Sequence, residues 1–161
     1  MDFLWSPWRS HYVASQKKPP GCVFCHIIKN PPESDPESFV LWRGQFNFII
    51  LNLFPYTTAH LMIVPYDHTA DFAGLNKSTS DEMMDLAKRT QGIIAAQYKP
   101  DGFNLGMNLG VAAGAGIANH LHLHILPRWK GDANFMTTIG ETRVLPESLE
   151  GTYQKLVKHF Q

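Results

Sequence analysis

The sequence predicts an α+β protein built on an antiparallel sheet of about five strands with two main helices. Strand-like segments follow one another through short connections, and two long helical patterns stand apart instead of alternating with the strands. A length of 161 residues with 44% hydrophobic content suits one compact core. We expect an N-terminal arm over residues 1–21, which ends in Lys-Lys-Pro-Pro-Gly, and a single domain over residues 22–161.

A short helix and three strands are predicted in the first half of the domain. Apolar residues repeat on one helical face just after the first cysteine: Val23, Phe24, Ile27 and Ile28. A proline-rich loop over 31–36 follows. Strand patterns cover 39–42, 46–53 and 61–64, and a short connection that contains Gly44 joins the first two as a hairpin.

The second half of the domain is predicted to hold the two main helices and two further strands. Thr79 with Glu82 three residues later has the pattern of a capping box, so we expect a helix to start there and to end near residue 98. Strand patterns follow over 103–108 and 121–126. A last amphipathic helix should begin at about residue 147.

The charge balance argues against several classes of partner. Fourteen basic and fourteen acidic side chains give a net charge of zero, whereas proteins that bind a nucleic-acid backbone usually carry a basic surplus. No segment reaches the roughly 18 apolar residues of a membrane span, and the N-terminus lacks the apolar stretch of a secretory signal. We therefore expect a cytoplasmic protein with neither nucleic acid nor membrane as partner. Low net charge also favours a homo-oligomer.

The most informative segment places three histidines in strict alternation with apolar residues. His120, His122 and His124 share one face of the predicted strand, about 6.6 Å apart, while the residues between them face the core. Such a row can hold a transition metal. Alternatively, one imidazole acts as a nucleophile while its neighbours position the group that it attacks.

A glycine-rich loop stands directly before the histidine strand. Residues 110–116 read Gly-Val-Ala-Ala-Gly-Ala-Gly, which is typical of a loop that approaches a ligand closely. Backbone amides of such loops bind phosphate oxygens. The loop lacks the Lys-Ser/Thr of a P-loop, so nucleotide hydrolysis of that kind is not expected. Together with the histidines, it favours chemistry at phosphorus.

Two cysteines are the only ones in the chain and stand three residues apart. Cys22 and Cys25 have the spacing of a zinc knuckle, yet they supply only two of the four ligands that tetrahedral zinc needs. Buried reduced thiols and a redox pair are the alternatives.

The segment His-Leu-His-Leu-His-Ile-Leu over 120–126 resembles the signature of the histidine triad (HIT) superfamily. Residues 52–65 resemble the family's second conserved block, and residues 108–128 resemble the block that contains the triad. Residues 4–9 and 128–136 look most like its diadenosine tetraphosphate phosphorylase branch. The resemblance implies a HIT-like fold, a nucleotide substrate and a homodimer, for which the helix over 83–94 and the strand over 103–108 are the expected interface.

The resemblance also implies a role for each matching residue. His122 would attack the α-phosphorus of a nucleotide and form a nucleotidyl-histidine. His124 would contact phosphoryl oxygens and the leaving group, with His60 supporting it from the neighbouring strand. Nucleotide and phosphate contacts are expected from the loop amides and three asparagines: Gly114, Ala115, Gly116, Asn52, Asn108 and Asn119. Loop capping is the other reading of the asparagines.

Part of the superfamily holds a structural zinc, and the matching ligands here are Cys22, Cys25, His68 and His120. No catalytic metal is expected, since no carboxylate cluster stands near the triad in sequence. The preferred reaction is phosphorolysis of diadenosine tetraphosphate to ADP and ATP. The alternatives are a hydrolase of nucleotide phosphoramidates or dinucleoside polyphosphates, and a non-catalytic metal- or nucleotide-binding module.

Overall fold

The predicted fold class is confirmed by the computed structural model, which describes residues 21–140 and 144–160. Five antiparallel strands form one sheet in the order β1-β2-β3-β5-β4. The strands are β1 (Val40–Arg43), β2 (Asn47–Leu51), β3 (Leu61–Pro65), β4 (Gly102–Gly106) and β5 (Leu123–Arg128). The helices are α2 (Val23–Lys29), α3 (Asp35–Ser38), α4 (Lys77–Tyr98), α5 (Phe135–Thr138) and α6 (Leu149–Val157), with 3₁₀ turns η1 (Pro32–Ser34) and η2 (Val111–Ala113).

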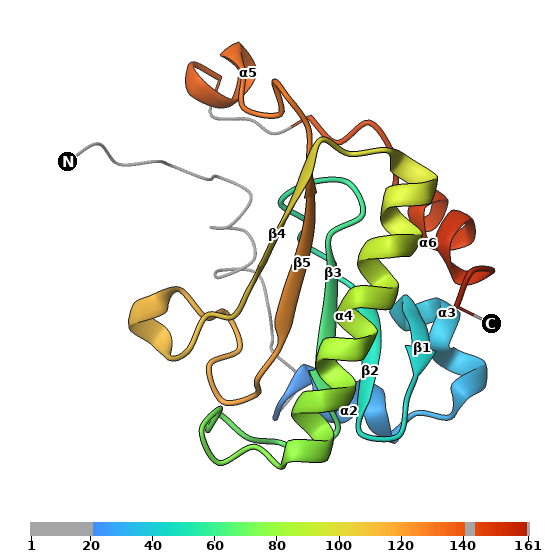
Figure 1. The fold of residues 1–161 in the computed structure, drawn as a ribbon, viewed down its shortest axis with the longest axis vertical. Helices are drawn as coiled ribbons and strands as arrows, with labels where there is room; N and C mark the ends of the chain where they lie inside the picture. Colours follow the sequence, from blue (N-terminus) through green and yellow to red (C-terminus); the bar gives the residue numbers. More distant parts are fainter. Residues whose placement is uncertain (1–20, 141–143, 161) are drawn as a thin grey trace.

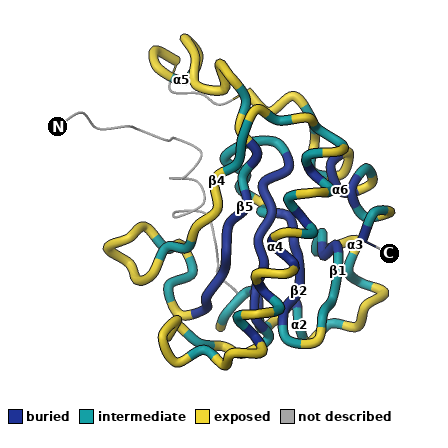
Figure 2. Tube along the Cα trace, in the orientation of Figure 1, coloured by how far each residue is buried: buried dark blue, intermediate teal, exposed yellow. Residues whose placement is uncertain are grey.

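The two faces of the sheet are covered by different helices. Helix α4 runs along one face, with α6 beside it (Figure 1), and their apolar residues share a core with Ile49, Ile63 and Ile125. Residues on the opposite face of the strands pack with α2 in a second cluster around Phe24. Figure 2 shows the central strands buried between these layers. Because alternate strand residues point to opposite faces, His124, which pairs with Met62, lies on the α2 face.

The apolar side of α4 is used within the chain itself. Met83, Leu86, Ala87 and Ile94 are buried against the sheet, which accounts for the helical period seen in the sequence. The helix over 83–94 was expected at a dimer interface, and these four apolar residues are not available for one because they pack within the chain.

The predicted capping box at the start of α4 is wrong. The helix begins at Lys77 after Asn76, so Thr79 lies within the first turn with its side chain buried. Glu82 instead accepts hydrogen bonds from the backbone N–H groups of Gln45 and Phe46, both at 2.7 Å. The turn between β1 and β2 has unpaired donors that a carboxylate satisfies, and these tertiary partners outweigh a local cap.

The region over 31–36, expected as a loop, contains η1 and the start of α3. Arg43 fixes this segment through a bidentate ion pair with Asp35, at 2.7 Å for the shortest contact. The expected arm over 1–21 lies outside the described residues except for Gly21. Among the helices of the described part, none is both long and apolar enough to cross a bilayer.

Candidate active site

Two of the three histidines of the row, His122 and His124, line a cleft beside β5, and His120 lies outside its lining. His120, His122 and His124 are at most 7% exposed, and His60 from the loop before β3 is 1% exposed. The cleft has a volume of about 590 Å³, and His122 and His124 contribute to its lining. Its apolar wall comes from α2 and the α2 face of the sheet: Phe24, Ile27, Ile50 and Met62. A strand pattern read from sequence thus places two buried imidazoles against a cavity of ligand size.

The cleft also brings together most of the predicted phosphate and nucleotide contacts. Asn52, Asn108, Asn119, Gly114 and Gly116 all contribute to the lining. Ala115 belongs to the same loop but does not line the cleft. Segments separated by more than 60 residues in sequence therefore meet at one cavity, as expected for a binding site on this face of the sheet.

His122 is held in one tautomer by the backbone. Its Nδ1 lies 2.9 Å from the carbonyl oxygen of His120, and because a carbonyl only accepts, Nδ1 carries the proton in the neutral ring. The lone pair of the neutral imidazole is then on Nε2. Burial lowers the pKa of His122 below the ordinary histidine value, against the opposing effect of this hydrogen bond. Neutral His122 can therefore act as a base or as a nucleophile, with its ring held by this hydrogen bond.

His124 is the end of a hydrogen-bonded chain that starts in the β2–β3 loop. The backbone N–H of Tyr56 donates to Nδ1 of His60 at 3.1 Å, so the proton of neutral His60 is on Nε2. That Nε2 donates to Nδ1 of His124 at 2.9 Å, which leaves the His124 proton on Nε2. At Nε2, His124 is therefore a hydrogen-bond donor, whereas His122 is an acceptor.

His124, the last residue of this hydrogen-bonded series, is kept neutral by its surroundings. Burial, with a smaller contribution from the charge of His122, lowers the pKa of His124 to about 4. The amide of Asn52 supports the chain, since its Nδ2 lies 3.3 Å from His60 Nδ1 and its Oδ1 accepts from the Phe54 N–H at 3.0 Å. Asn52 thus also has the loop-capping contacts expected of an asparagine in a turn.

Two backbone N–H groups of the glycine-rich loop form hydrogen bonds within the loop itself. The N–H groups of Gly114 and Ala115 donate to the carbonyls of Val111 and Gly110, at 3.0 and 3.4 Å. Gly110 and Gly114 have φ angles of 85° and 88°, a region that residues with a Cβ rarely adopt. The glycines at these two positions are required by the turn, and Gly116 extends from it along the cleft.

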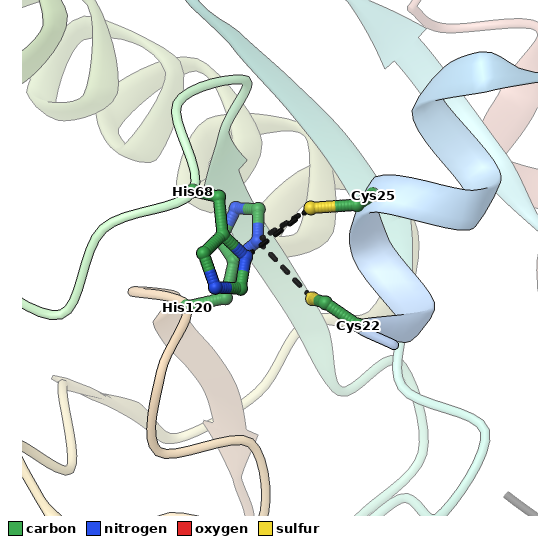
Figure 3. Close-up of side chains that lie close together, drawn as sticks. All are labelled: Cys22, Cys25, His68 and His120. Atoms are coloured by element: carbon green, nitrogen blue, oxygen red, sulfur yellow. Dashed lines mark hydrogen bonds between the residues drawn. The ribbon is translucent and has the colours of Figure 1, made fainter. Parts of the chain in front are cut away.

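The predicted metal ligands converge next to the cleft, whose lining includes Cys22 and His68. Cys22, Cys25, His68 and His120 come from α2, the loop after β3 and the segment before β5, and Figure 3 shows their side chains pointing toward one another. Their candidate ligand atoms all lie within 4.8 Å of one another. Nδ1 of His120 is 3.3 Å from Sγ of Cys22 and 3.6 Å from Sγ of Cys25, and Nδ1 of His68 is 3.2 Å from Sγ of Cys25.

This cluster has the chemistry and the dimensions of a four-coordinate metal centre. A tetrahedral zinc with Zn–S of about 2.3 Å and Zn–N of about 2.1 Å holds neighbouring sulfur and nitrogen ligands about 3.6 Å apart. The observed sulfur–nitrogen distances lie at or slightly below that value. His120 also donates from Nε2 to the Pro65 carbonyl at 2.8 Å, which directs the Nδ1 lone pair to the cysteines. These residues can hold a metal ion.

Phe24 contacts both the metal-ligand cluster and the cleft histidines, a role that sequence reasoning missed. Its ring is 5.3 Å from that of His120 and 5.4 Å from that of His122. Tyr56 was likewise not singled out, although its ring lies 4.8 Å from His60. Both contacts arise from tertiary packing. The position of Phe24 between two cysteines on one helix is the only sequence signal that could have indicated it.

The fold places two buried imidazoles of opposite tautomer, His122 and His124, at a cleft beside a Cys₂His₂ cluster. This combination defines a class of α+β proteins whose ligand site is built from histidines. The HIT domain profile matches residues 34–131 of this sequence. A protein of Mycobacterium tuberculosis named AP-4-A phosphorylase is 39% identical over 98% of this chain and 83% of its own length. The chain belongs to the HIT family.

Two further relatives extend the comparison. A protein of Saccharomyces cerevisiae named Bis(5'-adenosyl)-triphosphatase is 35% identical over 56% of this chain and 44% of its own length. A crystal structure described as a Zn-bound histidine triad family protein from Mycobacterium smegmatis superimposes with a TM-score of 0.68 and 27% identity, over 87% of this chain and 93% of that chain.

Proposed function

We propose that this protein is a nucleotide-processing enzyme that cleaves dinucleoside polyphosphates by transferring a nucleotidyl group to His122. The observation that carries the proposal is the hydrogen bond from His122 Nδ1 to the His120 carbonyl, which leaves the Nε2 lone pair as the reactive atom. The likeness to the relative named AP-4-A phosphorylase supports diadenosine tetraphosphate as the substrate.

In the first step, His122 Nε2 attacks the α-phosphorus. A P–N bond forms, the P–O bond to the remaining three phosphates breaks, and ATP leaves while AMP stays on the histidine. His124, with its proton on Nε2, donates a hydrogen bond to the oxygen that leaves. The N–H of Gly116 and the side chains of Asn108 and Asn119 are our candidates for binding the phosphoryl oxygens, and Asn52 for the ribose.

In the second step, a phosphate oxygen attacks the same phosphorus, the P–N bond breaks and ADP is released. His122 regains its lone pair, so the cycle is complete. If water takes the place of phosphate, AMP is released instead. The likeness to the relative named Bis(5'-adenosyl)-triphosphatase favours this hydrolytic alternative.

We also propose zinc as the metal of the Cys22, Cys25, His68 and His120 cluster. The sulfur and imidazole donors are those that zinc prefers, and the solved HIT structure described as Zn-bound is similar in fold. There zinc would tie the N-terminal end of α2 to the residues before β5. We further propose that residues 22–161 form a single domain and that the protein assembles as a homodimer.

The product profile from diadenosine tetraphosphate tests the reaction. The protein is incubated with the substrate with and without inorganic phosphate, and the nucleotides are separated by chromatography. We expect ADP and ATP only when phosphate is present. AMP and ATP without phosphate would identify a hydrolase, and absence of any product under both conditions would contradict the proposal.

A further inference from the structure

A second cavity, of about 830 Å³, lies at the end of the sheet where β5 finishes. The β2–β3 loop, the C-terminal end of α4 and the segment leading to α5 come together there (Figure 1). Its lining includes Tyr98, Trp129, Lys130 and Glu147. Tyr56 lines both this cavity and the cleft, so the two cavities adjoin at one side chain.

Strand β5 runs from one cavity to the other. His124, Leu126 and Arg128 alternate along the strand and so share a face, with His124 in the cleft and the other two in the second cavity. With the rise of an antiparallel strand, the Cα atoms of His124 and Arg128 are about 13 Å apart. A ligand that reaches both cavities must therefore be long and must pass over this face.

The neighbouring strand leaves that path open. The residues of β4 that pair with His124 and Arg128 are Gly106 and Gly102. A Cβ added at either glycine would meet no atom of the described residues within 4 Å, so this part of the chain leaves free space above β4 at both positions. Directly paired residues lie on the same face of an antiparallel sheet, and this space therefore borders the row on β5.

The chemistry of the second cavity suits a nucleoside better than a phosphate group. Arg128 is paired with Asp132 at 2.6 Å and Lys155 with Glu147 at 3.5 Å, so these cations are already neutralised. Lys130 is the one cation of the lining without an ion pair among the described residues. The half-buried ring of Trp129 and the side chain of Tyr56 offer flat surfaces for stacking a base.

We propose that the second cavity binds the distal nucleoside of a dinucleoside polyphosphate whose proximal nucleotide occupies the cleft. The polyphosphate chain would pass Tyr56 and follow β5. This inference rests on the proposed function for the choice of substrate. It assigns to Trp129 a contact with the second base and not with the reacting phosphorus.

Binding measurements test the assignment independently of turnover. A non-hydrolysable analogue of diadenosine tetraphosphate is compared with adenosine 5'-tetraphosphate, which has the same phosphate chain but lacks the second nucleoside, by isothermal titration calorimetry. In Trp129→Ala, we expect the Kd of the diadenosine analogue to rise at least about tenfold, as stacking contributions to single bases suggest. The Kd of adenosine 5'-tetraphosphate should stay within about twofold, since no stacking contact is lost.

Two further variants complete the test. Trp129→Phe keeps a stacking surface and should retain most of the affinity for the diadenosine analogue. Phe135→Ala removes an exposed aromatic side chain that does not line the cavity, and should change neither Kd. Equal weakening of both ligands in Trp129→Ala, or no weakening of either, would overturn the assignment. Absence of turnover in the product assay would instead contradict the proposed function and leave this comparison of binding valid.

Discussion

His122 and His124 stand two residues apart on one face, yet their hydrogen bonds give them opposite chemical character. The backbone carbonyl of His120 accepts a hydrogen bond from the Nδ1–H of His122, whereas His60 donates to Nδ1 of His124. In the neutral state, His122 therefore presents a lone pair at Nε2 and His124 presents a proton there. The different character of the two rings comes from their hydrogen-bond partners, one of them 64 residues away in sequence, and not from the residue type.

Replacing His122 tests the nucleophile. His122→Ala and His122→Asn should lower turnover of diadenosine tetraphosphate by at least roughly 1,000-fold, because neither side chain can form the P–N bond. Initial rates and circular dichroism are measured together to show that the fold is kept. The control is His26→Ala, an exposed histidine on α2, which should keep full activity. Turnover retained in either His122 variant would refute the assignment.

The pH dependence follows from burial of the same two rings. Attack needs neutral His122, and burial lowers its pKa below the ordinary value of about 6.5. Activity should therefore persist below pH 6.5 and fall only as the pH passes through the lowered pKa. His124, with a pKa of about 4, stays neutral over most of that range. A profile of kcat/KM from pH 4 to 8 measures this, and a half-maximum at or above about pH 6.5 would contradict it.

At the scale of elements, two features bear on stability: the short helix α2 and the C-terminal end of α4. Helix α2 has only seven residues, too few for stability on its own, and is held by packing of Phe24 and by the Cys22 and Cys25 cluster. Helix α4 is long, and the residue that follows its last turn, Lys99, has a left-handed φ of 48°. Helix α2 therefore relies on tertiary contacts, and α4 is followed by a residue in a conformation that favours glycine.

Removal of the metal should loosen α2. We expect the purified protein to contain about one zinc per chain, and Cys25→Ser to lose it together with at least about 2 kcal/mol of stability, or roughly 4–8 °C in Tm. Elemental analysis and thermal unfolding provide the two readouts. His26→Ala on the same helix should retain both metal and Tm. Protein that never contains zinc, or a Cys25→Ser variant that keeps it, would exclude this role.

Substitution by glycine should have opposite effects on the free energy of unfolding just after the end of α4 and within that helix. Lys99→Gly places glycine at an exposed left-handed position and should raise the free energy of unfolding by about 0.5–1 kcal/mol. Lys88→Gly, at an exposed position within the same helix, should lower it by about 1 kcal/mol. Urea unfolding compares both with the parent chain. Equal signs for the two variants would show that the backbone conformation at Lys99 is not the determining factor.

At the scale of the whole molecule, one edge of the sheet is the feature that points beyond a single chain. Among the described residues β4 is the last strand at that edge, and Leu105 on it is 47% exposed. Unpaired edge strands readily add a further strand. We expect the homodimer to form through this edge, in contrast to the buried face of α4, which is already used by the core.

Light scattering coupled to size exclusion measures the assembly. The parent chain should elute at twice its mass of 18.2 kDa. Leu105→Arg adds a charge at the edge and should shift the mass toward one chain, since a charge on an edge strand opposes pairing. Met84→Arg, exposed on α4, serves as the comparison, and a larger effect there would move the interface to the helix.

Much of this fold was predictable because periodic patterns report on burial. The alternation over 120–126 and the apolar period of α4 both match buried faces in the structure. The start of α4 was mispredicted because Glu82 serves a turn 36 residues away, which local spacing cannot reveal. The cleft was predictable through the histidines and glycines. The contacts of Phe24 and Tyr56 were not, since they depend on how α2 and the β2–β3 loop pack.

The ring of Phe24 between His120 and His122 has a thermodynamic consequence. The segment over residues 22–29 supplies both two candidate donors of the metal cluster and part of the cleft wall, so a ligand that orders this segment at one site acts on the other site as well. Linkage makes such an effect reciprocal. If a metal ion raises the affinity for nucleotide by some factor, nucleotide raises the affinity for the metal by the same factor, and under metal scarcity the ion would then stay longest on the chains that hold nucleotide.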